Sequence, residues 1–317
     1  MFKMKNEKKK FNLNIYAIIV GTILVLYSLS IISPLLWGIM TSLKHRLDFT
    51  PDTVLSFPSL DTWKEYDGNL FTNYLDLFST LRIYAAKTFF AGFNLSVEVE
   101  HHNDVNLIGF TLNTILYAGG TALFGTLAPC IMGYLCSKFK YKFSKIVYTF
   151  VLFVMVMPIV GNTTAVITLL RKLYLYDTIW GMWIKGFTFA NSYFLIFFAF
   201  FSGMSNTYAE AAQIDGASYF RVMWRIYVPL ASKTLSTVFL LQFVAHYNDY
   251  NTSLVYIPTH PTLAYAVWYF GRGMAGGKEN PPFNFAASMA LAMPMVIIFI
   301  IFKNKLMGNI SVGGIKE

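Results

Sequence analysis

The sequence predicts an all-α integral membrane protein with six transmembrane helices. Its 317 residues are 56% hydrophobic and only 13% charged, whereas soluble domains carry about 25% charged residues. The same balance excludes a disordered chain, which needs low hydrophobicity and many charges. The apolar residues also form long uninterrupted runs, and about 20 such residues are enough to cross a bilayer as a helix.

Six apolar segments supply the predicted transmembrane helices. Five are free of charge and lie at 11–43, 105–137, 146–170, 186–209 and 280–302. The sixth follows Lys233 and contains Asp249, which a span beginning near Pro229 would place close to its far end. The first segment follows a lysine-rich start, but its apolar part exceeds the roughly 7–15 residues of a signal-peptide core, so we interpret it as a retained span.

The basic residues predict that both termini are cytoplasmic. Of the 25 Lys and Arg residues, 15 fall in four groups that lie on one side if the chain crosses six times, and cytoplasmic loops carry such an excess. The net charge of +9 is therefore a topology signal and gives no reason to expect a nucleic-acid partner. The predicted parts are an N-terminal tail at 1–12, helix 1 at 13–43, an extracellular region at 44–108, a permease core at 109–302 and a C-terminal tail at 303–317.

The sequence of the cytoplasmic loop at 205–229, between the fourth and fifth spans, predicts a short helix within the loop. Thr207 and Glu210 have the spacing of a capping box, in which each side chain accepts a hydrogen bond from the other residue's backbone N–H. Ala211 and Ala212 favour helix. We expect Gly216 to end it by adopting a left-handed conformation.

A second short helical piece is predicted after that turn. It carries Arg221 and Arg225 and stops at Pro229, because proline lacks the N–H that a continuing helix needs. The two pieces form a helix-turn-helix elbow, whose small side chains let another protein approach its backbone. An amphipathic helix lying on the membrane surface is the alternative interpretation.

The loop resembles the signature of the membrane subunits of binding-protein-dependent ABC importers. That signature is Glu-Ala-Ala, three residues, Gly, nine residues, Ile, one residue and Leu-Pro, and this chain has Val228 in place of the Leu. In that family the elbow is the coupling helix, which sits in a cleft on the ATPase subunit. The resemblance implies an ATPase-coupling role for Glu210, Ala211, Ala212, Asp215, Gly216, Ile226 and Pro229.

The resemblance extends over most of the chain and is greatest to the second permease of maltose-type sugar transporters. The matching segments lie at 34–37, 41–44, 73–78, 113–114 and 246–249. The glycine-rich tail is similar to the one that reaches between the two ATPases in that family. It implies ATPase contacts for Gly313, Gly314 and Lys316, although this chain ends in Glu317 where glycine is common.

An insert at about 79–106 departs from the family pattern. Its alternation at 94–100 predicts a strand with Glu98 and Glu100 on one face. We expect that the insert thickens the outer surface where a solute-binding protein docks. A loop embellishment without a binding role is an equally good interpretation.

The chain contains no convincing nucleotide site. Residues 271–279 resemble a phosphate-binding loop, but no Ser or Thr follows Lys278. We therefore expect no cofactor on this chain, with ATP and magnesium bound by separate ATPase subunits. The resemblance implies instead that the glycines of this outer loop contact the binding protein; these are Gly271, Gly273, Gly276 and Gly277.

Asp249 is the one carboxylate within or at the edge of a predicted span, and ionisable residues in such positions are functional candidates. It could couple protons in a secondary transporter, line a substrate path together with Asn113 and Asn248, or bond to neighbouring backbone at the helix end. The pattern offers no metal site, and Cys130 and Cys136 are expected to be small buried hydrophobes.

These observations predict a permease subunit of an ATP-driven importer in the bacterial cell membrane, not an enzyme. By the resemblance, it translocates a carbohydrate delivered by an extracellular solute-binding protein. The implied partners are a second permease subunit in a heterodimer, two ATPase subunits and membrane lipid. A proton-coupled secondary transporter using Asp249 is the alternative. The sequence argues against an integral membrane enzyme, because it has no nucleophile-base set and no paired carboxylates near the spans.

Overall fold

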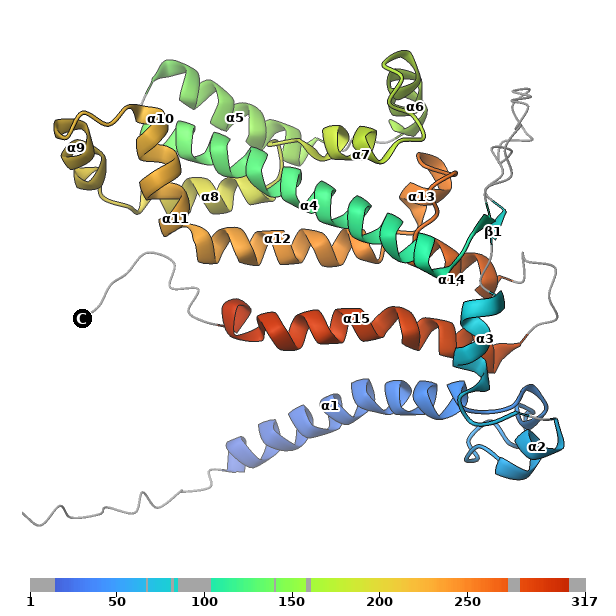
Figure 1. The fold of residues 1–317 in the computed structure, drawn as a ribbon. Helices are drawn as coiled ribbons and strands as arrows, with labels where there is room; N and C mark the ends of the chain where they lie inside the picture. Colours follow the sequence, from blue (N-terminus) through green and yellow to red (C-terminus); the bar gives the residue numbers. More distant parts are fainter. Residues whose placement is uncertain are drawn as a thin grey trace, which may run out of the picture. The chain divides into compact units, whose positions relative to one another are not determined.

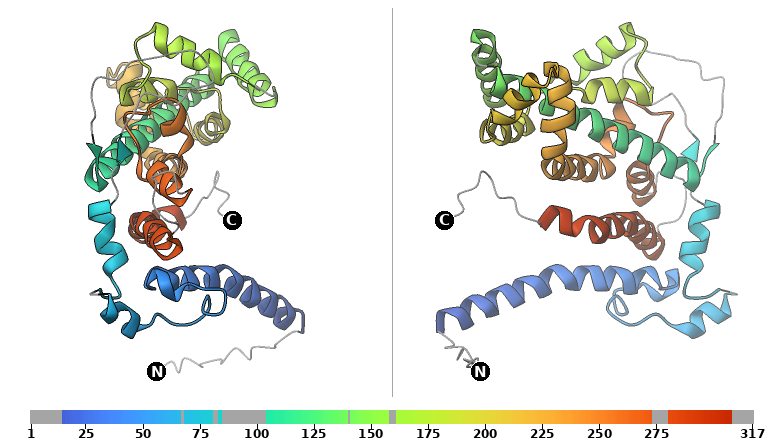
Figure 2. Two further views of the ribbon diagram at one scale, coloured as in Figure 1. Left: turned by 90° about the vertical axis from the view of Figure 1, so that its right-hand side faces the viewer. Right: turned by 60° about the vertical axis from the view of Figure 1, so that its left-hand side comes forward.

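The computed structural model describes residues 15–66, 68–80, 83–84, 104–139, 141–157, 161–272 and 280–307. This part of the chain is helical (Figures 1 and 2), and the strands within it are a single antiparallel pair of two residues each, β1 (Ile83–Tyr84) and β2 (Asp104–Val105). The prediction of an all-helical fold is confirmed. The predicted strand at 94–100 and the rest of the insert between β1 and β2 lie outside the described residues.

The described residues divide into two compact units, one within 1–75 and 280–289 and the other within 76–279 and 290–317. The helices up to the insert are α1 (Ile15–Ser42), the 3-10 helix η1 (Arg46–Asp48), α2 (Leu60–Glu65) and α3 (Thr72–Thr80). Those that follow are α4 (Leu107–Lys138), α5 (Lys142–Val156), α6 (Thr163–Lys172), α7 (Ile179–Gly186), α8 (Ser192–Ser202), α9 (Thr207–Ile214), α10 (Tyr219–Val222), the π-helix η2 (Met223–Tyr227), α11 (Val228–Leu230), α12 (Ser232–Tyr247), α13 (Asn251–Val255), α14 (Leu263–Gly271) and α15 (Pro281–Met307).

Two helices in the described part of the chain are long and apolar enough to cross a membrane, α1 from Ile18 and α4. A third is added if the bent pair Tyr219–Leu230 and Ser232–Tyr247 is one span. The predicted span at 146–170 corresponds to two helices, α5 and α6, and that at 186–209 to the 11-residue α8. The count of six spans therefore stays a prediction.

In the larger unit, α4 is the central helix and packs against α7, α8 and α12 (Figure 1). Glycines on α4 allow this approach. A Cβ added at Gly133 would lie 2.8 Å from the Cβ of Phe197 on α8, and one added at Gly125 would lie 2.4 Å from the amide oxygen of Gln242 on α12. Small residues at such crossings are what close packing of membrane helices requires.

In the smaller unit, Asn73 of the motif at 73–78 contacts the motif at 41–44 where α1 ends. The Asn73 side-chain amide donates to the backbone oxygens of Ser42 and Lys44, at 2.8 Å each. The Lys44 side chain is fully buried and its Nζ donates to the carbonyl oxygens of Thr53 and Val54, at 2.6 and 3.0 Å. Asn73 therefore satisfies the Ser42 carbonyl, which the end of α1 leaves unpaired, and Lys44 satisfies two carbonyls of the turn at 51–56.

Candidate functional site

The elbow lies at the end of the larger unit where α4 terminates, and α9 is its first helix (Figure 1). α9 begins at Thr207, whose N–H donates to Ser205 Oγ at 3.2 Å and whose hydroxyl pairs with the same oxygen at 2.7 Å. The Glu210 N–H donates to the Asn206 carbonyl at 3.1 Å. The predicted capping box is therefore wrong, because Thr207 is already inside the first turn and its hydroxyl is engaged by Ser205.

The C-terminal end of α9 follows the prediction. Gly216 has a φ of 79°, its N–H donates to Gln213 O at 3.0 Å, and the next N–H, of Ala217, donates to Ala212 O at 2.9 Å. These two bonds define a Schellman motif, which satisfies the last carbonyls of a helix and needs a residue in the left-handed region. Gly216 thus sets the direction in which the chain leaves α9.

The second half of the elbow differs from the prediction of a short helix ending at Pro229. α10 continues into the π-helix η2 and then into α11, which contains Pro229 near its start and ends at Leu230. The bend, of 73°, comes between α11 and α12, at Ala231. Pro229 has no N–H to donate, and it stands just after the π-helical turn, a kind of turn that is a frequent site of helix distortion.

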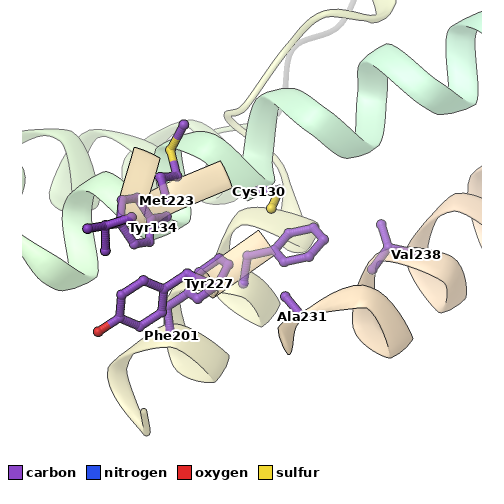
Figure 3. Close-up of a cluster of buried hydrophobic side chains, with 9 residues drawn as sticks. Cys130, Tyr134, Phe201, Met223, Tyr227, Ala231 and Val238 are labelled. Atoms are coloured by element: carbon purple, nitrogen blue, oxygen red, sulfur yellow. The ribbon is translucent and has the colours of Figure 1, made fainter. Parts of the chain in front are cut away.

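A buried hydrophobic cluster supports the elbow (Figure 3). Its side chains come from α4, α8, α10, η2, α12 and the residue between α11 and α12, and they pack together. We call it the elbow cluster, and its members are Cys130, Tyr134, Phe197, Phe201, Val222, Met223, Tyr227, Ala231 and Val238. Cys130 occupies a core position here, as expected of a small hydrophobe.

Two polar contacts fix the elbow to this cluster. Tyr227 is fully buried, and its hydroxyl donates to the Ser205 carbonyl at 3.0 Å, joining the end of the elbow to its beginning. The Nζ of Lys138, at the end of α4, donates to Met204 O at 2.6 Å and to Asn206 Oδ1 at 3.1 Å. It also lies 4.9 Å from the centre of the Tyr227 ring. Neither contact follows from the sequence pattern, in which Lys138 is only one of the basic residues that indicate topology.

The signature residues divide into a packed set and an exposed set. Ala212 and Ile226 pack against the elbow cluster. The exposed residues of the signature are Glu210, Ala211, Asp215, Gly216 and Pro229. Large apolar side chains that face outward lie beside them, including Ile214, which is 86% exposed, and Phe220, which is 70% exposed. The elbow therefore has an exposed set of residues that includes two carboxylates, and a packed set that holds it to the elbow cluster.

The family of this chain follows from residues 125–303, which match the family model described as the binding-protein-dependent transport system inner membrane component. That stretch includes the whole elbow and most of the larger unit. The chain belongs to this family. Its members are transport components, so the permease is a membrane protein of a transport system, as the resemblance predicted.

Three known proteins are similar to the permease over most of its length. The diacetylchitobiose uptake system permease protein NgcG of Streptomyces coelicolor is 22% identical over 94% of this chain and 88% of its own length. The trehalose transport system permease protein SugB of Mycobacterium tuberculosis is 24% identical over 95% and 97%. A bacterial ABC transporter involved in import of the acidic polysaccharide alginate contains a chain with the same fold, with a TM-score of 0.66 at 19% identity over 93% of this chain and 98% of that one.

Asp249 follows α12 and serves as the acceptor for the start of α13. Its Oδ1 accepts the N–H groups of Asn251 and Thr252, at 2.9 and 3.1 Å, and its Oδ2 accepts the hydroxyls of Thr252 and Tyr117. Burial lowers the pKa of Lys185 on α7, and the nearby Asp249 carboxylate opposes part of that shift. The two bonds from backbone N–H groups give Asp249 a capping role at the start of α13, and the Tyr117 hydroxyl ties it to α4.

The other predicted path residues do not converge on Asp249. The Asn113 side chain donates to the Pro261 carbonyl at 3.0 Å, tying α4 to the loop before α14. The exposed Asn248 donates to Val244 O, within its own helix. A substrate path through these residues stays a prediction.

Several predicted residues lie outside the part of the chain that the structure describes. They are Glu98, Glu100, Gly273, Gly276, Gly277, Gly313, Gly314 and Lys316. Gly271 is described and is the last residue of α14. Among the described residues, His, Cys, Asp and Glu side chains form no group of three that could hold a metal ion.

Proposed function

We propose that this chain is the permease subunit of an ATP-driven ABC importer, in which α9 transmits the movement of an ATPase partner. The observation that carries the proposal is an exposed eight-residue helix whose N-terminal end is held by Tyr227 and Lys138 and which packs against a buried cluster, in a binding-protein-dependent transport component. The proposed assembly is a heterodimer with a second permease, two ATPase subunits and an extracellular binding protein.

The geometry supports a simple transmission route. A partner that pushes on Glu210, Ala211 and Asp215 acts on a helix that cannot swing freely, because Tyr227 and Lys138 tie its base to the elbow cluster. The displacement passes to α4 and α12, which supply part of that cluster. Coupling of this kind needs two distinct sites and an element whose position both of them bias.

A carbohydrate is the proposed substrate class. The relatives are named for diacetylchitobiose and trehalose, and the alginate transporter has also been solved in complex with an alginate pentasaccharide-bound periplasmic protein. Both termini are proposed to be cytoplasmic. ATP and magnesium belong to the proposed ATPase partners, and no step of the mechanism requires bond-breaking chemistry by this chain.

Charge reversal at Glu210 tests the proposal. Glu210→Lys is expected to lower uptake of the transported sugar at least tenfold, because it places a cation in the first turn of α9, where the helix dipole favours an anion, and on the exposed face proposed to meet the ATPase. Uptake of labelled sugar and the amount of protein in the membrane are both measured. Glu210→Gln, which removes the charge without reversing it, is expected to lose less. Normal uptake by Glu210→Lys would overturn the coupling role.

Substitution of Asp249 separates ATP-driven transport from the proton-coupled alternative. Asp249→Asn is expected to retain most of the uptake, because the Asn side-chain oxygen can still accept the N–H groups of Asn251 and Thr252. Asp249→Ala removes that acceptor and is expected to lower uptake and stability. The proton-coupled alternative makes the opposite prediction, since Asn cannot titrate: both variants would abolish uptake, and an uncoupler would do the same to the unsubstituted protein.

A further inference from the structure

The segment after α1 folds back on the end of that helix. Trp37 Nε1, on α1, donates to the Val54 carbonyl oxygen at 3.1 Å, and Lys44 Nζ donates to the same oxygen at 3.0 Å. Trp37 stands five residues before Ser42, the last residue of α1, which corresponds to about 7 Å of helical rise. Long side chains in a helix lean toward its N-terminus. The Val54 carbonyl therefore lies beside the last turns of α1 and not beyond its end.

Hydrogen bonds fix the shape of this segment. The Thr53 hydroxyl donates to the Asp48 carbonyl at 2.6 Å, and the Ser56 N–H donates to the Thr53 carbonyl at 3.0 Å. The Trp63 indole of α2 donates to the Leu43 carbonyl at 3.0 Å, which ties α2 to the residue just past α1. Residues 53–56 are thus held beside α1 as a turn, while α2 is attached at a point past the helix end.

Two large apolar side chains project from this segment into the surroundings. Leu55 is 78% exposed and Phe57 is 84% exposed, and we call this pair the apolar tip. Residues 53–60 carry no charge, and the Lys44 cation that holds the turn is fully buried. Exposing such apolar surface to water is unfavourable, and because the turn is fixed, the tip cannot fold inward. The tip therefore has the composition of a contact surface.

The depth of the tip follows from α1. This helix is long and apolar enough to cross a membrane from Ile18 to Ser42, so its end marks one edge of the hydrocarbon core. The interfacial region adds about 5–8 Å of headgroups on each side of that core. Leu55 follows Val54 directly, and Phe57 is two residues further along. The tip therefore falls at the level where the span enters the headgroups.

We propose that the apolar tip inserts into the bilayer interface beside the end of α1, with lipid as its partner. Apolar and aromatic side chains anchor proteins at this level of a membrane, and a charge-free turn is compatible with it. A binding protein is the other candidate occupant, but it would approach from beyond the end of α1. α2 is attached on that side, and its exposed Asp61 and Lys64 suit water or a protein surface and not lipid.

A spin label beside the tip tests the proposal. Ser56→Cys, labelled with a nitroxide, leaves Leu55 and Phe57 in place, and the buried native thiols are replaced by alanine. The full-length chain, purified with the proteins that accompany it in the membrane, is reconstituted in vesicles of phosphatidylglycerol and phosphatidylcholine. The access of the label to oxygen, relative to a water-soluble nickel chelate, is expected to be at least about fivefold higher than for Asp61→Cys, because apolar oxygen concentrates in lipid and the chelate stays in water.

Charges in the tip provide the matched test. Leu55→Asp combined with Phe57→Asp is expected to bring the ratio at position 56 to within about twofold of that at position 61, because a carboxylate is costly to move out of water. Phe71→Asp adds the same charge at another exposed apolar residue of the smaller unit and should leave the ratio unchanged.

Three kinds of result would overturn the insertion. Equal ratios at positions 56 and 61 in the chain with an intact tip would place the tip in water. Low access to both oxygen and the chelate would show that protein covers the tip, and if that cover appears only after the binding protein is added, the tip belongs to a docking surface for that protein. A high ratio that survives the two Asp substitutions would mean that the tip residues do not cause insertion. The measurement uses neither sugar nor ATP, so its result is independent of the coupling role of α9.

Discussion

Gly216→Pro is expected to reduce sugar uptake to background while the amount of protein in the membrane stays unchanged. Proline fixes φ near −65°, whereas Gly216 has a φ of 79°. The substitution also removes the N–H that donates to Gln213 O. Because the Schellman motif ends α9, its loss lets α9 unwind or change direction, and the exposed face of the elbow is no longer presented to a partner.

Two further variants make this prediction specific. Gly216→Asn is expected to keep most of the uptake, because Asn tolerates the left-handed region and nothing lies within 4 Å of a Cβ at this position. Gly161 has a φ of 77° and equally open surroundings, so Gly161→Pro also places a proline where φ is positive, but outside the elbow. It should retain clearly more uptake than Gly216→Pro. Normal uptake by Gly216→Pro would contradict the coupling proposal.

Charge-free runs located the long helices because bilayer length imposes a strong constraint on sequence. They failed to show where a run is broken. The apolar stretch at 146–170 contains two helices, and Gly161, in the left-handed region, stands directly before α6. Hydropathy averages over such a residue, so it cannot distinguish one long span from two short helices.

The elbow shows the same division between local and long-range information. Gly216 was predictable because its role depends only on its own backbone and that of its neighbours. The capping box was wrong because Ser205, an upstream residue, competes for Thr207. The anchor from Tyr227 to Ser205 joins residues 22 positions apart and depends on how η2 turns. Only the tyrosine hydroxyl itself hinted at it, since a buried hydroxyl needs a partner.

Tyr227→Ala is expected to lower thermal stability markedly and to abolish stimulation of ATPase activity by the binding protein. Tyr227 is fully buried, and its ring lies 5.2 Å from that of Tyr134 and 6.3 Å from that of Phe201. Removing a buried aromatic ring costs about 3–5 kcal/mol. Tyr227→Phe keeps the ring and loses only the hydrogen bond to Ser205, which is worth about 1 kcal/mol. Stimulation of ATPase activity by the binding protein should therefore be reduced but still present in this variant.

Phe194→Ala separates anchoring from stability in that experiment. Phe194 is also fully buried, on α8, but it belongs to a different cluster with Cys136, Val147 and Val151. Its truncation should lower the melting temperature of the purified complex by an amount similar to Tyr227→Ala, yet ATPase stimulation per folded complex should persist. If both variants lose stimulation equally, the effect of Tyr227 reflects general destabilisation. If only Tyr227→Ala loses ATPase stimulation, the contact between the two ends of the elbow is what lets α9 transmit movement.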